Sequence, residues 1–186
     1  MNARTVYYAA MSLDGYIAES DDTIEWLMGY PGVEPDPAVT TVQGGYDEFY
    51  QDVGALVMGS VTYEFVLGHA SSWDYAGKPT WVLSSRDLPV FEGADQLTIT
   101  NAAVTDLYDE MVAAAGDRML WVVGGGNVAS QFADAGLLDA VWVTVVPVVL
   151  GIGKPLFDRR VEPLMRPTEV LPRPSGMIEL RYELVR

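Results

Sequence analysis

Three consecutive glycines follow an apolar run in the segment Leu120-Trp121-Val122-Val123-Gly124-Gly125-Gly126-Asn127. The run has the length of a buried strand, and the residues after it follow a helical pattern. Glycines at such a turn let backbone N–H groups come close to a ligand, because no Cβ lies in the way. The following helix would point its positive N-terminal end at the same place, which suits a phosphate. The motif indicates a nucleotide site, although steric demands at a strand end also select glycine.

Two acidic residues stand where they could take part in chemistry. Asp14 precedes Gly15, a common turn pair, so it is either a turn residue or part of a loop that closes over a ligand. Asp47 lies beside the apolar face of a predicted helix, where a solvated charge is the favoured interpretation. If Asp47 were buried near Tyr46 and Thr144, it could instead donate a proton to a substrate.

The composition is that of a globular protein. The chain has 186 residues, of which 49% are hydrophobic, so we expect one domain spanning residues 1–186. The N-terminal segment lacks the pattern of a secretory signal, and no uncharged stretch reaches the roughly 20 apolar residues that span a bilayer. From this we expect a cytoplasmic protein.

Charge and cysteine content narrow the possible partners. The net charge of −15 repels nucleic acids and anionic membranes, so neither is expected as a partner. The chain has no cysteine, which excludes a disulfide framework and any thiolate metal site, and no metal site is predicted. A site for a polyanionic cofactor would need backbone amides, helix ends and a few local cations.

Strand and helix patterns alternate along most of the chain. Strand-like apolar runs occur at residues 6–10, 55–58, 80–83, 96–99, 119–123 and 140–146. Helical spacing links Tyr46, Phe49, Tyr50 and Val53, and a second set runs from 104 to 115 with Gly116 as a cap. Shorter helices are predicted after residues 59–62 and after the glycine triplet, the latter ending at Gly136. This alternation predicts an α/β fold with a mostly parallel central sheet flanked by helices.

The last part of the chain has a different pattern. Residues 177–184 alternate between apolar and charged, which is typical of a half-buried antiparallel strand. The turn-forming residues 172–176 precede it, so residues 168–171 are expected to form the other arm of an antiparallel C-terminal hairpin.

Five motifs occur along the chain in one characteristic order. They are Met11-Ser12-Leu13-Asp14-Gly15-Tyr16-Ile17-Ala18, Met58-Gly59-Ser60-Val61-Thr62-Tyr63-Glu64, Val82-Leu83-Ser84-Ser85-Arg86, Val123-Gly124-Gly125-Gly126-Asn127 and residues 147–157. The order resembles dihydrofolate reductases. The first and last motifs are more specifically similar to the C-terminal reductase domain of the riboflavin-biosynthesis deaminase-reductase and to its stand-alone bacterial homologues.

The resemblance implies a dihydrofolate-reductase-like sheet that binds NADPH across the C-terminal strand ends. The residues that would flank the nicotinamide are Ala10, Asp14, Gly15 and Ile17. Those that would face the phosphates at a helix N-terminus are Gly59, Ser60 and Thr62. Those around the adenine ribose and its 2′-phosphate would be Ser84, Ser85 and Arg86. Those that would hold the pyrophosphate and the nicotinamide ribose are Gly124, Gly125, Gly126, Asn127 and Val128. The resemblance also implies a cis peptide bond between Gly124 and Gly125.

The chain departs from the family pattern at several positions. Ser60 stands where an arginine is frequent, so the 2′-phosphate would depend on Arg86. Val123 replaces a glutamate that is common in riboflavin reductases. The acid expected on the first helix would be Asp47, although Gln43 lies nearer to the expected spacing, and Thr144 matches the threonine that supports this acid.

The resemblance therefore implies a reductase that transfers hydride from NADPH to a small conjugated heterocycle such as a pterin, a folate or a pyrimidine. Asp47 and Thr144 would form its catalytic pair. The alternative is a nucleotide-binding or regulatory module of the same fold whose catalytic machinery has lapsed. A homodimer is expected in either case.

Overall fold

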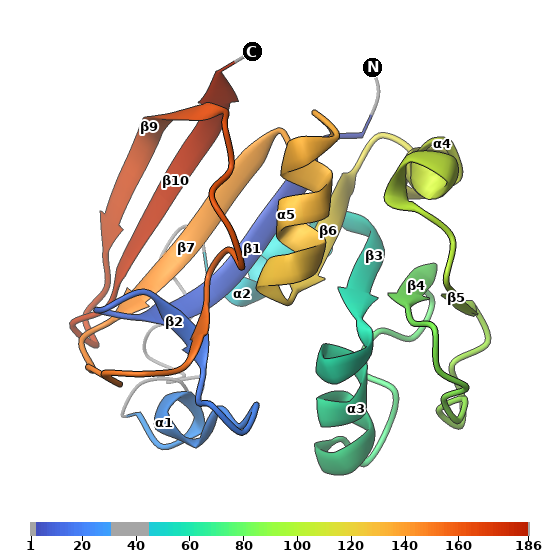
Figure 1. Cartoon of the computed structure of the whole chain (residues 1–186), viewed down its shortest axis with the longest axis horizontal. Helices are drawn as coiled ribbons and strands as arrows, with labels where there is room; N and C mark the ends of the chain where they lie inside the picture. The colour runs from blue at the N-terminus through green and yellow to red at the C-terminus, as the bar shows by residue number, and fades with distance from the viewer. Residues whose placement is uncertain (1–2, 31–44, 186) are drawn as a thin grey trace.

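An eight-stranded mixed sheet forms the centre of the computed structural model, which describes residues 3–30 and 45–185 (Figure 1). In spatial order its strands are β5 (Leu97–Thr100), β4 (Thr80–Leu83), β3 (Val53–Gly59), β6 (Met119–Gly124), β1 (Thr5–Ser12), β7 (Ala140–Val146), β10 (Ile178–Val185) and β9 (Leu164–Pro172). The pairs from β5 to β7 are parallel, and β10 runs antiparallel to both β7 and β9. The mostly parallel sheet and the C-terminal hairpin predicted from the sequence are confirmed.

Helices cover both faces of this sheet. They are α1 (Glu25–Met28), α2 (Tyr46–Gln51), α3 (Ser60–His69), α4 (Val104–Ala115) and α5 (Gly126–Asp134). In Figure 1, α5 lies in front of the sheet and α2 behind it. Adjacent residues of a strand point to opposite faces, so Tyr7 packs in the core cluster that contains Phe132 of α5, and Val6 packs in the cluster that contains Phe49 of α2.

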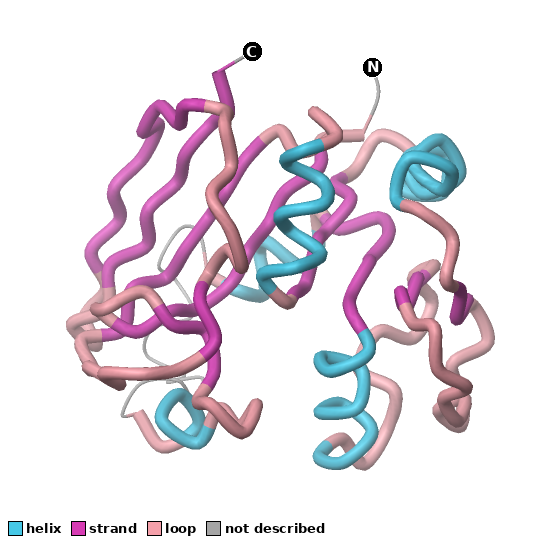
Figure 2. The backbone as a smooth tube through the Cα atoms, viewed as in Figure 1, coloured by secondary structure: helices cyan, strands magenta, loops and turns pink. Residues whose placement is uncertain are grey.

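A second, two-stranded sheet was not predicted from the sequence (Figure 2). Strand β2 (Tyr16–Ala18) pairs antiparallel with β8 (Lys154–Pro155). Gly153 permits this pairing, because a Cβ there would lie 2.3 Å from the carbonyl oxygen of Ala18. The pairing brings the first and last family motifs side by side.

Most predicted elements agree with the structure, and β4 and β7 begin and end at the predicted residues. The prediction that residues 46–53 share one helix was wrong at its C-terminal end. Helix α2 ends at Gln51, and Val53 opens β3, where it pairs with Met119. In the described part of the chain, no helix has the length and apolar character needed to cross a bilayer.

Gly54 supplies a test of the packing between β3 and α4. A Cβ at this position would lie 2.2 Å from the carbonyl oxygen of Ala115. We expect Gly54→Ala to lower the free energy of unfolding by about 1 to 3 kcal/mol, because overpacking forces the backbone to move. Urea denaturation measures the change.

Gly68→Ala is the matched control, because a Cβ at that helical position would have no atom within 4 Å apart from its chain neighbours and the backbone of its own helix. It should leave the free energy of unfolding unchanged or raise it by up to about 1 kcal/mol. Equal values for the two variants would contradict the close approach at Gly54.

Candidate functional site

The carboxyl ends of the parallel strands meet at one edge of the sheet, where the central strand is open. In β1, Thr5, Val6 and Tyr7 are buried, whereas residues 8–11 are partly exposed. Strand β1 lies between β6 and β7, and both neighbours also end at this edge. Ligands of open α/β sheets bind outside the carboxyl ends of the strands, so this edge is the candidate site.

Several residues predicted to bind the cofactor converge here. A Cβ on Gly59 would lie 3.3 Å from Cγ2 of Val128, and one on Gly124 would lie 3.4 Å from Oγ1 of Thr62. A Cβ on Gly125 would lie 4.0 Å from Cδ1 of Ile17. The peptide bond between Gly124 and Gly125 is cis, which confirms that expectation. The ends of β3 and β6, the first turns of α3 and α5, and Ile17 of β2 therefore form one cradle, and side chains in place of its glycines would narrow it.

Both helices that start at this cradle begin directly after a strand. Helix α3 begins at Ser60 with Gly59 as its N-cap, and α5 begins at Gly126 with Gly125 as its N-cap. Neither cap residue has a side chain that could bond to the first-turn N–H groups. The two helix N-termini thus give this edge a positive backbone field of the kind that attracts phosphate groups.

One side of the α5 N-terminus is closed by the end of β8 and by the residues that follow it. A Cβ on Gly126 would lie 2.6 Å from the carbonyl oxygen of Pro155. The side-chain amide of Asn127 donates a hydrogen bond of 2.6 Å to Asp158, and Arg159 also bonds to this carboxylate. Burial raises the pKa of Asp158, but these bonds outweigh it and lower the pKa below its ordinary value. The Asn127 side chain is therefore bonded to Asp158 on this side of the helix.

Asp14 joins the turn before β2 to the loop before β8. Its carboxylate accepts hydrogen bonds from the Ser12 hydroxyl at 2.6 Å and from the backbone N–H groups of Leu150 and Gly151 at 3.1 and 2.7 Å. The Ser12 hydroxyl lowers the pKa of Asp14, and the two backbone donors add to the effect. Gly15 follows with φ of +92°, a conformation that favours glycine. Asp14 is thus a turn residue that also fastens the turn to the loop before β8, and its role beside a nicotinamide stays a prediction.

The residues that were predicted to surround the 2′-phosphate lie at the end of β4, and two of them are already hydrogen-bonded within the protein. The Ser84 hydroxyl accepts a hydrogen bond from the Arg86 N–H and donates one to the Arg86 carbonyl, both at 3.0 Å. The Arg86 guanidinium forms two hydrogen bonds, of 2.9 and 2.6 Å, to Glu64 of α3. Ser85 is exposed beside them. Glu64 was not predicted as a site residue, because these partners lie on different elements and no local pattern links them.

The predicted catalytic pair is not brought together. Asp47 is exposed on α2, and this helix instead turns Phe49 toward the sheet, where its ring lies 4.5 Å from that of Tyr8. The side chain near Thr144 is instead that of Tyr8, whose hydroxyl oxygen lies 3.5 Å from Oγ1 of Thr144. Strand alternation could have found Tyr8, because it shares a face of β1 with Ala10, the register partner of Thr144. Gln43 lies outside the described residues.

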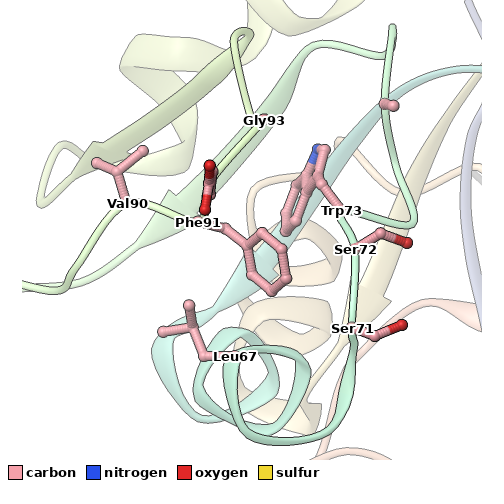
Figure 3. A pocket seen from close by; sticks show the side chains of 9 residues that line it. Leu67, Ser71, Ser72, Trp73, Val90, Phe91 and Gly93 are labelled. Atoms are coloured by element: carbon pink, nitrogen blue, oxygen red, sulfur yellow. The ribbon is translucent and has the colours of Figure 1, made fainter.

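A hollow of about 600 Å³ lies at the C-terminal end of α3 (Figure 3). Leu67, Trp73 and Phe91 give it an apolar wall, and the rings of Trp73 and Phe91 are 5.5 Å apart. None of the predicted site residues lines it. The strand edge, rather than this hollow, is where the family motifs meet.

Solved structures share this architecture. A protein of Shewanella sp. PV-4 that is named for riboflavin biosynthesis is 28% identical, with a TM-score of 0.81 and coverage of 98% of this chain and 99% of that one. A deaminase/5-amino-6-(5-phosphoribosylamino)uracil reductase of Thermotoga maritima is 14% identical, with a TM-score of 0.68 and coverage of 99% and 57%. The expected reductase-type, dihydrofolate-reductase-like fold is confirmed.

The sequence itself identifies the family. A Bacillus subtilis (strain 168) protein named YwjB is 33% identical over 157 residues, which cover 84% of each chain. The family model of the RibD C-terminal domain matches residues 67–178, which include β4, β7 and the glycine triplet at the end of β6. The chain therefore belongs to the RibD C-terminal domain family.

Proposed function

We propose that the protein is an NADPH-dependent oxidoreductase that reduces a small conjugated heterocycle of the pterin, folate or pyrimidine class. The observation that carries this proposal is the convergence of Ile17, Gly59, Thr62, Gly124 and Val128 at the carboxyl ends of adjacent parallel strands. Membership of a reductase-domain family supports it. NADPH supplies a hydride when bound, so the protein's own contribution is orientation, exclusion of water and delivery of a proton.

The residues present fit a dinucleotide. The cradle has no side chain at Gly124 and Gly125, so the backbone can approach a pyrophosphate closely. The α3 and α5 N-termini supply partial positive charge without a side chain. Such backbone groups matter in a chain with a net charge of −15, because salt screens only the more distant acidic side chains, beyond about 8 to 10 Å.

A second function is favoured by one observation. Asp47 is exposed and does not meet Thr144, which suits a nucleotide-binding or regulatory module with lapsed catalysis. A panel of dihydrofolate, dihydropterins, aminopyrimidines, flavins and quinones separates the two functions. Saturable NADPH binding without oxidation of NADPH by any of them would favour the module.

The dimer expected from the sequence forms part of the proposal. Strand β9 is an edge strand of the main sheet, and its side chains Leu164 and Val170 are 77% and 60% exposed. Exposed apolar edges of this kind pair readily with a second copy.

Cofactor binding is tested by a matched pair of glycine substitutions. A Cβ on Gly125 meets no atom closer than 4.0 Å, whereas one on Gly126 would lie 2.6 and 2.9 Å from two backbone carbonyl oxygens. We expect Gly125→Ala to keep the stability of the wild-type protein and to weaken NADPH binding at least about tenfold, because the methyl group enters the cradle. Gly126→Ala should lower the free energy of unfolding by about 1 to 3 kcal/mol.

Tryptophan fluorescence titration and urea denaturation measure the two effects. The absence of any saturable NADPH response in the wild-type protein would remove the proposed function. Unchanged NADPH affinity in Gly125→Ala would remove the cradle as the binding place.

The preference for NADPH over NADH depends on Arg86. A charge-assisted hydrogen bond to the 2′-phosphate contributes on the order of 1.5 to 3 kcal/mol, but the guanidinium must first leave Glu64. We therefore expect a preference of about tenfold, at the low end of that range. Arg86→Ala should abolish it by weakening NADPH binding, with NADH affinity unchanged.

Glu64→Gln should act in the opposite direction. An exposed ion pair is worth about 0.2 to 1 kcal/mol, so removal of the competing carboxylate should raise the preference by about 1.4- to fivefold. Equal affinities of the wild-type protein for the two cofactors, unchanged in Glu64→Gln, would contradict the role of Arg86.

A further inference from the structure

Tyr8 lies on the face of the sheet that α2 covers, directly beside the position where a substrate of the proposed reductase would meet the cofactor. It is partly exposed near the open end of β1, two residues before Ala10. Ala10 is the register partner of Thr144. The Phe49 ring at 4.5 Å and the Trp142 ring at 6.4 Å hold the phenol ring in place. The hydroxyl is thus fixed by packing rather than by a strong polar bond.

The contact between the Tyr8 and Thr144 hydroxyls leaves capacity for a ligand. Their oxygens are 3.5 Å apart, whereas ordinary O–H···O bonds measure about 2.5 to 3.0 Å. Each hydroxyl has one donor and two acceptor sites. A polar ring atom of a heterocycle can therefore accept from one of them without loss of a strong bond inside the protein.

The nearby carboxylates are less suited to meet a substrate. One oxygen of Glu179 is bonded to Nη2 of Arg173 and the other to Nε of Arg181 at 2.7 Å, and Glu179 is only 2% exposed. Asp47 is exposed on α2. Of the two hydroxyls that meet here, the phenol of Tyr8 is more acidic than the aliphatic hydroxyl of Thr144, so it is the group suited to give a proton.

We propose that Tyr8 is the catalytic proton donor of this site, with Thr144 as its hydrogen-bonding partner. This rests on the proposed function. Addition of hydride to a C=N bond of the heterocycle moves the electron pair of that bond onto nitrogen. The nitrogen then takes the proton of the Tyr8 hydroxyl, and the phenolate regains a proton from water. The sum is NADPH, one proton and the heterocycle giving NADP⁺ and the dihydro product.

The surroundings of Tyr8 keep it protonated in the resting protein. Burial raises the pKa of its phenol above the ordinary value, and the charge of Glu179 adds to this, while Thr144, Arg173 and Arg181 act in the opposite direction. Tyr46 of α2 also interacts electrostatically with Tyr8. The two guanidinium groups favour the phenolate that forms after transfer. The donor form should therefore persist across the neutral range and beyond the pH at which a free tyrosine ionises.

The test compares Tyr8→Phe with Tyr50→Phe, which removes a hydroxyl from the same face at a place distant from Thr144. The probes are NADPH and 7,8-dihydropterin, 7,8-dihydrofolate and a 5-aminouracil. For the heterocycle that is reduced, Tyr8→Phe should lower kcat by about 100-fold or more. By equilibrium fluorescence, its Kd for the heterocycle should rise only about two- to tenfold, the effect of one hydrogen bond. Tyr50→Phe should change neither.

The pH profile gives an independent measurement. With Tyr8 as donor, kcat of the wild-type protein should not fall as the pH rises from about 4 to about 9, whereas with a carboxylic acid donor kcat would fall between about pH 4 and pH 6 as that acid loses its proton. Two results would overturn the assignment while leaving the reductase function in place. One is a kcat of Tyr8→Phe equal to that of Tyr50→Phe. The other is a wild-type kcat that falls as the pH rises from about 4 to about 6. NADPH binding without reduction of any probe would overturn both.

Discussion

The close approach of backbone to backbone at the start of α5 and on either side of β8 is the constraint on which the candidate site depends. The carbonyl oxygens of Pro155 and Leu156 lie where a Cβ of residue 126 would stand, and the carbonyl oxygen of Ala18 lies where one of residue 153 would stand. Side chains at these positions would separate the α5 N-terminus from the loop that covers it and would break the pairing of β2 with β8. Because these glycines accept the contact, chain segments more than 100 residues apart reach the same edge of the sheet.

In the proposed function, one face of the sheet would bind the cofactor phosphates and the other would contact the substrate. On one face, α5 and the cradle present backbone donors, which suit phosphate groups. On the other, β1, β7 and β10 present Tyr8, Thr144 and the buried Glu179 with its two arginines. The Arg181 guanidinium also lies 4.0 Å from the centre of the Trp142 ring, which holds this polar group against an apolar surface. The open end of β1 belongs to both faces, so a cofactor and a substrate can meet there.

Apolar periodicity and turn chemistry predicted most of the fold, because each strand of the parallel sheet is a short buried run that ends at a polar or glycine turn. The pairing of β2 with β8 was not predictable in this way, since strands of two or three residues carry no period. The family motifs named residues that do converge at the ends of β3 and β6, while their role in binding a cofactor stays a prediction. They did not predict the Glu64–Arg86 pair or the Tyr8–Thr144 contact, because both join elements whose relative position depends on tertiary packing. The position of Asp47 was also not predictable from local pattern. Helix α2 packs on the sheet through Phe49, and this packing leaves the Asp47 carboxylate facing outward.

The Asp14 carboxylate has a mechanical consequence. It bonds on one side to Ser12, at the end of β1, and on the other to the backbone of Leu150 and Gly151, and the Leu156 N–H adds a bond to the Gly15 carbonyl. The two segments are thus clamped at two points and must shift as one body. A ligand that displaces the turn before β2 will also displace the loop before β8 and, through Asn127 and Asp158, the first turn of α5. A shift at one of these segments would therefore reach the other through the same bonds, without any rearrangement of the sheet itself.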